Sequence, residues 1–359
     1  MVSSEMITME ELLKIARDNK ASDVHITVGV PPKMRVDGKL MDMNFPRLSP
    51  GDTSTIISGI LSEKQMDILR EKGEVDMSFS IPQVGRYRVN AYMQRGSMSA
   101  AIRLVGTQIP KAEDLGVPES VIELYKKKRG LIIVTGPTGS GKSTTLASII
   151  DRINENKESH IITLEDPIEY LHTHKNSMVN QREIGMDSNS YANALRAALR
   201  EDPDVILVGE MRDLETIATA ITAAETGHLV LSTLHTIGAA STIDRIIDVF
   251  PPHQQQQVRF QLSMVLECVV SQQLIERDKV SGRVAAFEVM HSTVAIKNLI
   301  RENKTFQIGS TIQTNKKQGM QTMDDALFEL YITGQISAES AMSYAQDLQY
   351  MERKLSGKI

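Results

Sequence analysis

A short apolar run followed at once by a glycine-rich turn constrains the fold of this chain most strongly. Residues 131–135 (Leu-Ile-Ile-Val-Thr) lead directly into the pattern G-x-x-x-x-G-K-S at 136–143, and apolar residues recur within 146–150. This order predicts a strand, a phosphate-binding loop and a helix. The glycines let backbone N–H groups turn toward phosphates, Lys142 supplies a positive charge, and the Ser143 hydroxyl suits Mg²⁺. We therefore expect the chain to bind a nucleoside triphosphate. The expected binding residues are Gly136, Pro137, Thr138, Gly139, Ser140, Gly141, Lys142, Ser143 and Thr144.

Composition excludes several classes of protein. The chain has 359 residues, 41% of them apolar and 24% charged, which is ordinary for a globular protein with room for two domains. A net charge of −5 gives no general reason to expect nucleic-acid binding. No apolar run reaches membrane-spanning length, and residues 1–6 lack the basic stretch of a secretion signal, so we expect a cytoplasmic protein without an integral membrane segment. Cys268 is the only cysteine, which excludes intrachain disulfides and tetracysteine zinc sites.

The first part of the chain predicts a small α+β domain at residues 1–110. Its two helical patterns lie at 8–20 and 61–71, and the turn pair Asp37-Gly38 predicts a hairpin. The expected strands lie at 23–26, 33–41, 76–81, 85–94 and 99–105. Two prolines, a glycine and no clear period mark a linker, placed at 111–118.

The second part, residues 119–359, alternates apolar strands with helical patterns. Such an order indicates a mostly parallel sheet covered by helices on both faces, and the fold class is therefore α/β. The expected strands lie at 131–135, 160–165, 204–209 and 229–234, and the expected helices at 142–153, 190–201, 213–225 and 238–248. Beyond Pro251-Pro252 we expect helical structure, interrupted by one strand at 283–290, with a helical carboxy-terminal region over about 291–359 that includes helices near 293–302 and 322–346.

Acidic residues follow two of the expected parallel strands, at the sheet edge where ligands collect in open α/β sheets. Glu165 ends one strand and Glu169 follows it closely, so either is a candidate to polarise an attacking water. Glu210 ends a second strand in the layout of a Walker B motif, where an acid holds or orients hydrated Mg²⁺. Because glutamate replaces the usual aspartate, we expect Glu210 to act on the metal through water. Acids in a solvated loop are the alternative for Glu165 and Glu169.

Two histidines and two arginines are the remaining catalytic candidates. His228 and His235 bracket the fourth strand, where a histidine could sense the γ-phosphate; an imidazole satisfied by nearby backbone is the alternative. Phosphoryl transfer gains from an arginine aimed at the γ-phosphate, often from a neighbouring subunit. Arg88 and Arg103 are the first choices for this role, with Arg86 and Arg95 behind them. Solvated arginines on an exposed sheet face are the alternative.

Taken in order, these segments resemble the secretion ATPases of type IV pilus and type II secretion systems, and within them the pilus retraction group. The resemblance runs from the first helix almost to the end of the chain. The segments that carry it are Ser22–Ile26, Gly85–Asn90, Gly136–Thr144, Leu164–Tyr170, Arg200–Asp213 and Ala223–His228.

The resemblance implies a PAS-like amino-terminal domain joined to a RecA-like P-loop NTPase core, with ATP and Mg²⁺ bound between the two domains. In that family 164–170 is the Asp box, 204–210 an atypical Walker B strand and 227–236 the His box. The resemblance further implies a homohexameric ring. Such a ring docks peripherally at the inner membrane on a PilC-like pilus platform protein and acts indirectly on pilin.

Two features favour retraction over extension. Relatives that extend pili or drive secretion usually carry a tetracysteine zinc insert, which a chain with only Cys268 cannot hold. The segment Ala295–Arg301 resembles the carboxy-terminal signature of the retraction group. That signature usually has arginine where Lys297 stands, and lysine lacks the planar fork needed for a bidentate contact. The buried stripe of an ordinary helix also accounts for the apolar residues of this segment.

Three functions remain open from the sequence. The first is an ATP-driven ring motor for pilus retraction, with pilus extension or type II secretion as its nearest variants. The second is a low-turnover ATP-binding regulator of pilus dynamics, which would hydrolyse no more ATP than a Lys142→Ala control. The third is a RecA-like DNA translocase, which the absence of a general basic charge disfavours.

Overall fold

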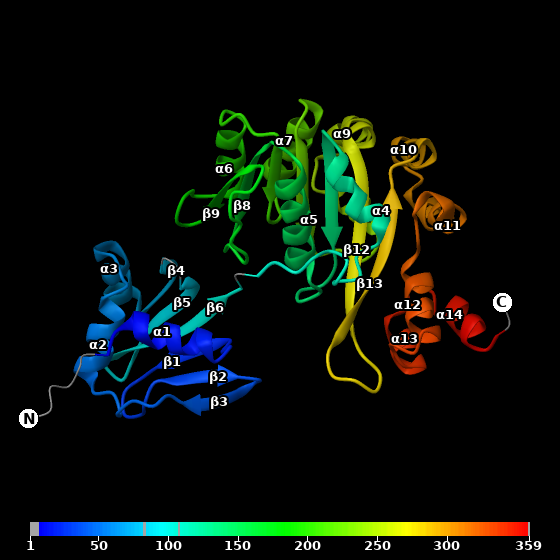
Figure 1. The fold of residues 1–359 in the computed structure, drawn as a ribbon. Helices are drawn as coiled ribbons and strands as arrows, with labels where there is room; N and C mark the ends of the chain where they lie inside the picture. Colours follow the sequence, from blue (N-terminus) through cyan, green and yellow to red (C-terminus); the bar gives the residue numbers. More distant parts are fainter. Residues whose placement is uncertain (1–6, 82–83, 107, 358–359) are drawn as a thin grey trace, which may run out of the picture. The chain divides into compact units, whose positions relative to one another are not determined.

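The computed structural model describes residues 7–81, 84–106 and 108–357, which fall into two compact units (Figure 1). The first unit runs to Gln108 and includes the short segment Glu169–Leu171. The second unit comprises Ile109–Ile168 and His172–Ile359. Residues 1–6, which the sequence analysis found to lack a basic stretch, lie outside the described residues. Each unit is described by itself.

The first unit is an antiparallel sheet of six strands in the order β3-β2-β1-β6-β5-β4. Alternation along β5 buries Tyr87, Val89 and Ala91, which join residues of all three helices in one core. Arg88 lies on the opposite, exposed face. The strands are β1 (Asp23–Ile26), β2 (Lys33–Val36), β3 (Lys39–Asp42), β4 (Glu74–Ile81), β5 (Gly85–Gln94) and β6 (Ser97–Val105), and the helices are α1 (Met9–Asp18), α2 (Pro50–Ser58) and α3 (Glu63–Lys72).

The second unit is built on a sheet of seven strands in the order β13-β12-β7-β11-β10-β8-β9. All neighbours are parallel except the edge pair β12 and β13, so the mostly parallel sheet expected from the sequence is confirmed. The strands are β7 (Gly130–Thr135), β8 (His160–Glu165), β9 (Met178–Glu183), β10 (Val205–Val208), β11 (Leu229–Leu234), β12 (Leu266–Glu276) and β13 (Arg283–His291).

Helices cover both faces of this sheet, which explains why its central strands are apolar throughout. One face packs against α4 (Glu119–Ile122), the 3₁₀ turn Glu123–Lys126 and α5 (Lys142–Asn156). The other face carries a larger core. The helices that contribute to it are α6 (Tyr191–Ala198), α7 (Leu214–Glu225), α8 (Ala239–Asp248), α9 (Pro252–Val265), α10 (Val294–Arg301) and α11 (Ile308–Thr314).

The expectation of continuous helical structure between Pro252 and residue 283 was wrong. Helix α9 ends at Val265, and β12 follows as a strand of 11 residues that pairs in parallel with β7 and antiparallel with β13. The polar run Ser271-Gln272-Gln273 hid this strand, because a buried parallel strand normally reads as continuously apolar. Cys268 lies in this strand and is fully buried.

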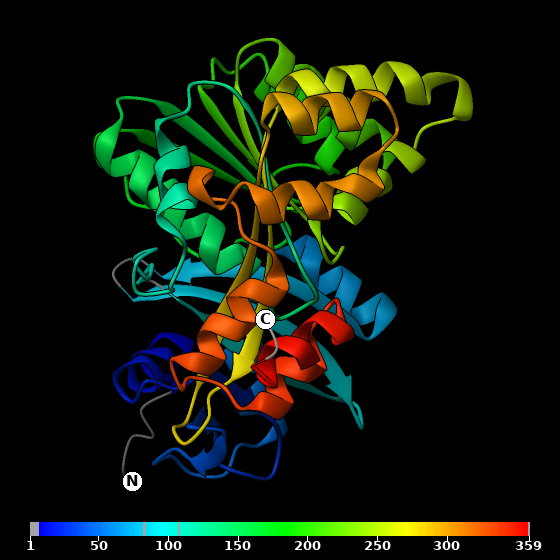
Figure 2. The same cartoon turned by 90° about the vertical axis from the view of Figure 1, so that its right-hand side faces the viewer.

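The carboxy-terminal helices pack against the far ends of β12 and β13 (Figure 2). A single helix over 322–346 was expected, but the structure has α12 (Met323–Ile332) and α13 (Ala338–Tyr344), followed by α14 (Leu348–Leu355). Gly334, with φ 70°, adopts the left-handed conformation that ends α12. None of the described helices has both the length and the apolar character that a bilayer span requires.

Candidate functional site

Four of the sequence-predicted features meet at one edge of the second unit's sheet. Strands β7, β11, β10 and β8 are neighbours and parallel, so their carboxyl ends lie side by side. The residues at or just after these ends are, in that order, the phosphate loop, His235, Glu210 and Glu165. This is the edge at which ligands bind in open α/β sheets.

The phosphate loop has the backbone that its glycines predict. Gly136 has φ 142°, and a Cβ there would lie 2.2 Å from the carbonyl oxygen of Gln272, so only glycine fits. Gly141 has φ 89° and immediately precedes the 15-residue helix α5. The Lys142 ammonium is buried, and Nζ donates to the carbonyls of Gly136 (2.9 Å) and Pro137 (3.0 Å). The lysine is thus folded over the loop at the amino terminus of α5.

Gln272 in β12 supports this loop from the neighbouring strand. Its Oε1 accepts a hydrogen bond of 2.8 Å from Thr145 Oγ1 in the first turn of α5, and both side chains are buried. Its Nε2 lies 2.9 Å from the place where a Cβ on Gly141 would be. Sequence reasoning missed Gln272, and only the pairing of β12 with β7 reveals it. The polar run inside this otherwise apolar strand was the available signal.

The loop fits the phosphates of a nucleotide. The hydroxyls of Ser140 and Thr135 are buried and, among the described residues, have no hydrogen-bond partner, which leaves donors at the cradle. Gly139 faces open space. Within the described ranges no three His, Cys, Asp or Glu side chains gather as a metal site.

Glu210 contacts two basic side chains at the same edge of the sheet. His235 Nε2 lies 2.9 Å and Arg212 Nε 2.5 Å from its Oε1, and the carboxylate side chain is 16% exposed. The hydrogen bond and charge of Glu210 raise the pKa of Arg212. A cavity of about 440 Å³ opens here, with Ile217 and Leu234 among its lining residues. The structure therefore brings His235 and Glu210, two sequence candidates, into direct contact.

Glu165 is held in place by two donors. Its Oε1 accepts hydrogen bonds from Thr163 Oγ1 (2.6 Å) and Gln181 Nε2 (3.2 Å). The Oε1 of Gln181 in turn accepts from the backbone N–H of His172 (2.8 Å), where the chain returns to the second unit. The protein therefore orients the Glu165 carboxylate, and the side chain remains partly exposed.

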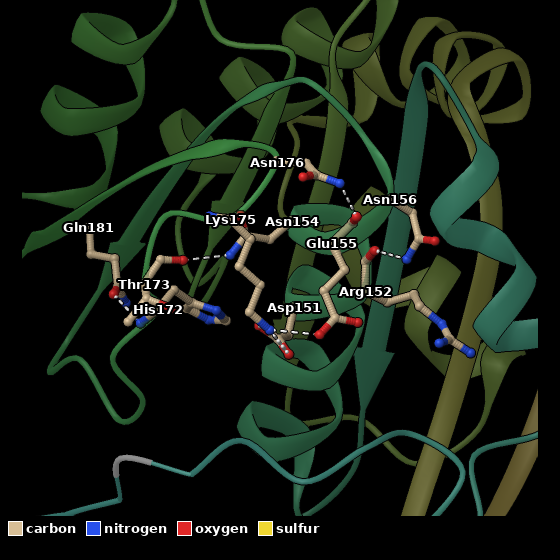
Figure 3. A network of polar contacts seen from close by, with 10 residues as sticks. All are labelled: Asp151, Arg152, Asn154, Glu155, Asn156, His172, Thr173, Lys175, Asn176 and Gln181. Carbon is tan, nitrogen blue, oxygen red and sulfur yellow. Dashed lines mark hydrogen bonds and ion pairs between the residues drawn. The ribbon is translucent and has the colours of Figure 1, made fainter.

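The segment after His172 is fastened to helix α5 (Figure 3). Lys175 Nζ donates to the carboxylates of Asp151 and Glu155, each at 2.8 Å. The buried side chain of Asn154 donates to the carbonyl of Thr173 and accepts from the backbone N–H of Lys175. Burial lowers the pKa of His172 to about 4, so its imidazole is neutral at physiological pH. These bonds link the support of Glu165 to the helix that follows the phosphate loop.

Tyr191, at the start of α6, is a site residue that sequence reasoning missed. Burial raises its pKa, and the carboxylates of Asp166, Glu210 and Glu165 raise it further. Its hydroxyl lies 2.9 Å from the place where a Cβ on Gly209 would be. A phenol kept protonated among three carboxylates can donate a hydrogen bond to them. No spacing rule connects Tyr191 with these acids in the sequence.

His228 does not join this edge. It precedes β11 at the amino end, and the six residues of the strand separate it from the loop's edge by about 20 Å. Its Nδ1 lies 2.9 Å from the carbonyl of Ala223. Within one chain, the structure therefore does not bring His228 to this phosphate loop, and its imidazole contacts nearby backbone, as in the alternative interpretation.

The remaining candidates lie in the first unit. Arg88 and Arg103 are direct cross-strand neighbours on the exposed face of its sheet. Arg103 Nε also donates to Asp23 at 3.0 Å; burial opposes ionisation of this carboxyl, yet Ser22 and Arg103 hold its pKa below the usual value. Glu169 is exposed and groups with the same unit. The second unit thus contains Glu165 and not Glu169.

Comparison with known proteins places the chain in a family. The family model described as "Type II/IV secretion system protein" matches residues 3–343. The chain belongs to this family. Family membership agrees with the observed combination of an α+β amino-terminal unit and a P-loop NTPase core.

Three similar proteins have descriptions that name pilus retraction or twitching motility. The type IV pilus retraction ATPase PilT of Pseudomonas aeruginosa is 49% identical over 94% of this chain and 97% of its own length. A twitching motility protein of Neisseria gonorrhoeae is 48% identical over 89% of this chain and 86% of its own length. A crystal structure of the pilus retraction motor PilT with bound ADP has a TM-score of 0.90 and 52% identity, covering 97% of this chain and 99% of that one.

Proposed function

We propose that this chain is an ATP-hydrolysing motor that powers type IV pilus retraction. The observation that carries the proposal is the 49% identity with a pilus retraction ATPase over 94% of the chain. The site agrees with it, because the phosphate loop, Glu210, His235 and Glu165 share one edge of the sheet. These are the components of a hydrolytic site rather than of a nucleotide-binding site alone.

The phosphate loop would hold ATP. Backbone N–H groups of residues 138–144 would cradle the phosphates at the amino terminus of α5, and Lys142 would exchange its loop carbonyls for phosphate oxygens. Ser143 would ligate Mg²⁺ directly, and Glu210 would hold it through water. When bound, Mg²⁺ neutralises charge on the phosphates and aligns the leaving group.

Glu165 is the better candidate for the general base. Its carboxylate is oriented by Thr163 and Gln181 within the unit that contains the phosphate loop. An oriented carboxylate can accept the proton of an attacking water without reorganising. His235, bonded to Glu210, would respond to the γ-phosphate and carry its loss to the loop that follows β11.

Arginines of the first unit would complete the site in an assembled ring. Arg88 and Arg103 are exposed side by side, and a neighbouring subunit of a homohexamer could aim them at the γ-phosphate. We further propose that the ring lies in the cytoplasm and docks on an inner-membrane PilC-like platform protein. The free energy of ATP hydrolysis would then drive the removal of pilin subunits.

A Lys142→Ala variant tests the proposal at two levels. Purified parent protein should hydrolyse ATP well above the level of the variant, because the variant lacks the charge that binds the phosphates. Cells carrying the variant should accumulate surplus pili that do not retract. Cells without any pili would instead indicate extension, and equal ATP hydrolysis by both proteins would indicate a regulator with little turnover.

A further inference from the structure

A buried carboxylate outside the hydrolytic edge joins three separate segments of the second unit. Glu288 lies in β13 and is 5% exposed. It accepts hydrogen bonds from the backbone N–H of Ala239 at 2.7 Å and of Met323 at 3.4 Å, and one from the side-chain amide of Gln346. Burial raises the pKa of Glu288, and these donors oppose the rise. One side chain therefore contacts the start of α8, the start of α12 and the connection between α13 and α14.

Glu288 supplies a cap that α8 lacks in its own sequence. The N-cap position of α8 is Gly238, which has no side chain to satisfy the first N–H groups of the helix. Glu288 accepts from one of these groups, and a negative charge at a helix amino terminus is also favoured by the helix dipole. Because the capping side chain belongs to β13, it both stabilises the start of α8 and holds it in place relative to the sheet.

Side chains of β12 and α8 hold the loop that precedes α8. The N–H of Gly238 donates to Ser271 Oγ at 3.0 Å, and its carbonyl accepts from Thr242 Oγ1 at 2.7 Å. The hydroxyls of Thr236 and Thr242 lie 2.7 Å apart. Gly238 itself has φ 88°, a conformation that favours glycine. The loop 236–239 is thus clamped between β12, β13 and its own helix.

This loop begins directly after His235. The imidazole of His235 meets Glu210 at 2.9 Å, so the position of the loop decides whether that contact forms. Displacements of about 1 Å in a catalytic group can cost on the order of 100-fold in rate. A residue that fixes this loop therefore controls the hydrolytic edge without touching it.

We propose that Glu288 is a positioning residue that holds the loop 236–239, and with it His235, against Glu210, and that it ties this edge to helices α12–α14. The inference rests on the proposed ATPase function and deepens it. Movement of His235 on loss of the γ-phosphate would pull on a carboxylate that the carboxy-terminal helices share. Those helices would then change position with the state of the nucleotide.

Asp324 provides a matched control within the same cluster. It is also a buried acid, and it accepts hydrogen bonds from the backbone N–H groups of Gln346 (2.7 Å) and Asp347 (3.0 Å). Neither of these two bonds involves the loop 236–239, although the side chain of Gln346 also donates to Glu288. Loss of Asp324 should therefore weaken the helical cluster while sparing the position of His235.

The test compares Glu288→Gln with Asp324→Asn in the full-length protein. A neutral amide cannot accept at both ends, so Glu288→Gln should lower kcat by about 10-fold or more while the KM for ATP stays within about two-fold. Hydrogen exchange should quicken in the backbone of residues 236–240. Asp324→Asn should lower Tm about as much as Glu288→Gln does, but it should keep kcat near the parent's value.

Ser271→Ala is the second variant, in case Glu288→Gln does not fold. It removes the other side-chain acceptor of the loop and should also lower kcat without raising KM. Unchanged kcat in the folded loop variants, or an equal loss of kcat in Asp324→Asn, would overturn the inference. A parent protein no more active than Lys142→Ala would instead refute the proposed function, so the two failures are distinguishable.

Discussion

Replacing Thr145 by valine should loosen the phosphate loop at its support in β12. The Thr145 hydroxyl is fully buried and donates to Oε1 of Gln272, which is only 3% exposed. Valine has nearly the same shape, so the substitution removes the donor and leaves little cavity. The amide oxygen of Gln272 then remains buried without this donor, at a cost of about 1–3 kcal/mol.

This cost should appear as a lower Tm and weaker nucleotide binding. For a unit of this size, each kcal/mol lowers Tm by about 2–4 °C. Gln272→Leu should lose less stability through unpaired polar groups than Thr145→Val does. The Thr145 hydroxyl can instead donate to the carbonyl of Gly141, one turn earlier in the helix. The double variant should recover much of the loss, since replacing both partners by apolar groups is nearly neutral.

A double-mutant cycle measured by thermal denaturation and by ATP affinity checks this reasoning. The two substitutions should be coupled by about 0.5–3 kcal/mol. The double variant should lose less stability than the two single variants lose in total. Additive single losses, or a Thr145→Val protein with parental Tm and affinity, would show that the bond does not support the loop.

Three further predictions address the acids. Glu210→Ala should retain ATP binding within a few-fold but lose turnover by about 100-fold or more, as measured by phosphate release against nucleotide titration; near-parental turnover would contradict the metal role. Glu165→Gln should lower kcat far more than Glu169→Gln, and the reverse ranking would make Glu169 the base. Burial disfavours the charged form of Asp325, yet two lysines, one of them Lys354, hold its pKa at about 2, below the usual 3.8. Its contribution to stability is therefore present above pH 3.8 and is lost as the pH falls toward 2; Asp325→Asn should flatten the loss of Tm over this interval, and an unchanged acid profile would refute the assignment.

The sequence predicted most of the hydrolytic edge because that edge is built from local patterns. An apolar strand that ends in a glycine turn or an acid is visible within about ten residues, and parallel strands align their ends without further information. Glu165, Glu210, His235 and the phosphate loop therefore met as expected. Helix α2 was missed, although Ser49 and Asp52 form a capping box that marks its start.

Other features depend on contacts between distant segments and were not predictable. Gln272 supports the loop only because β12 pairs with β7, and its polar side chain disguised the strand that carries it. Glu288 reaches the start of α8 across 49 positions of the chain. His228 shares a motif with His235, but a strand with histidines at both ends places them at opposite edges of the sheet.

The burial of the single cysteine makes this protein suitable for fluorescence experiments. Cys268 is closed to solvent, and this burial raises the pKa of its thiol. The reactive thiolate is therefore scarce. Maleimide dyes should therefore react with cysteines introduced at exposed positions while leaving the native one unlabelled. Energy transfer between two dyes, one in each unit, could then be recorded during the nucleotide cycle. Cys268 in β12 would not have to be replaced for this experiment.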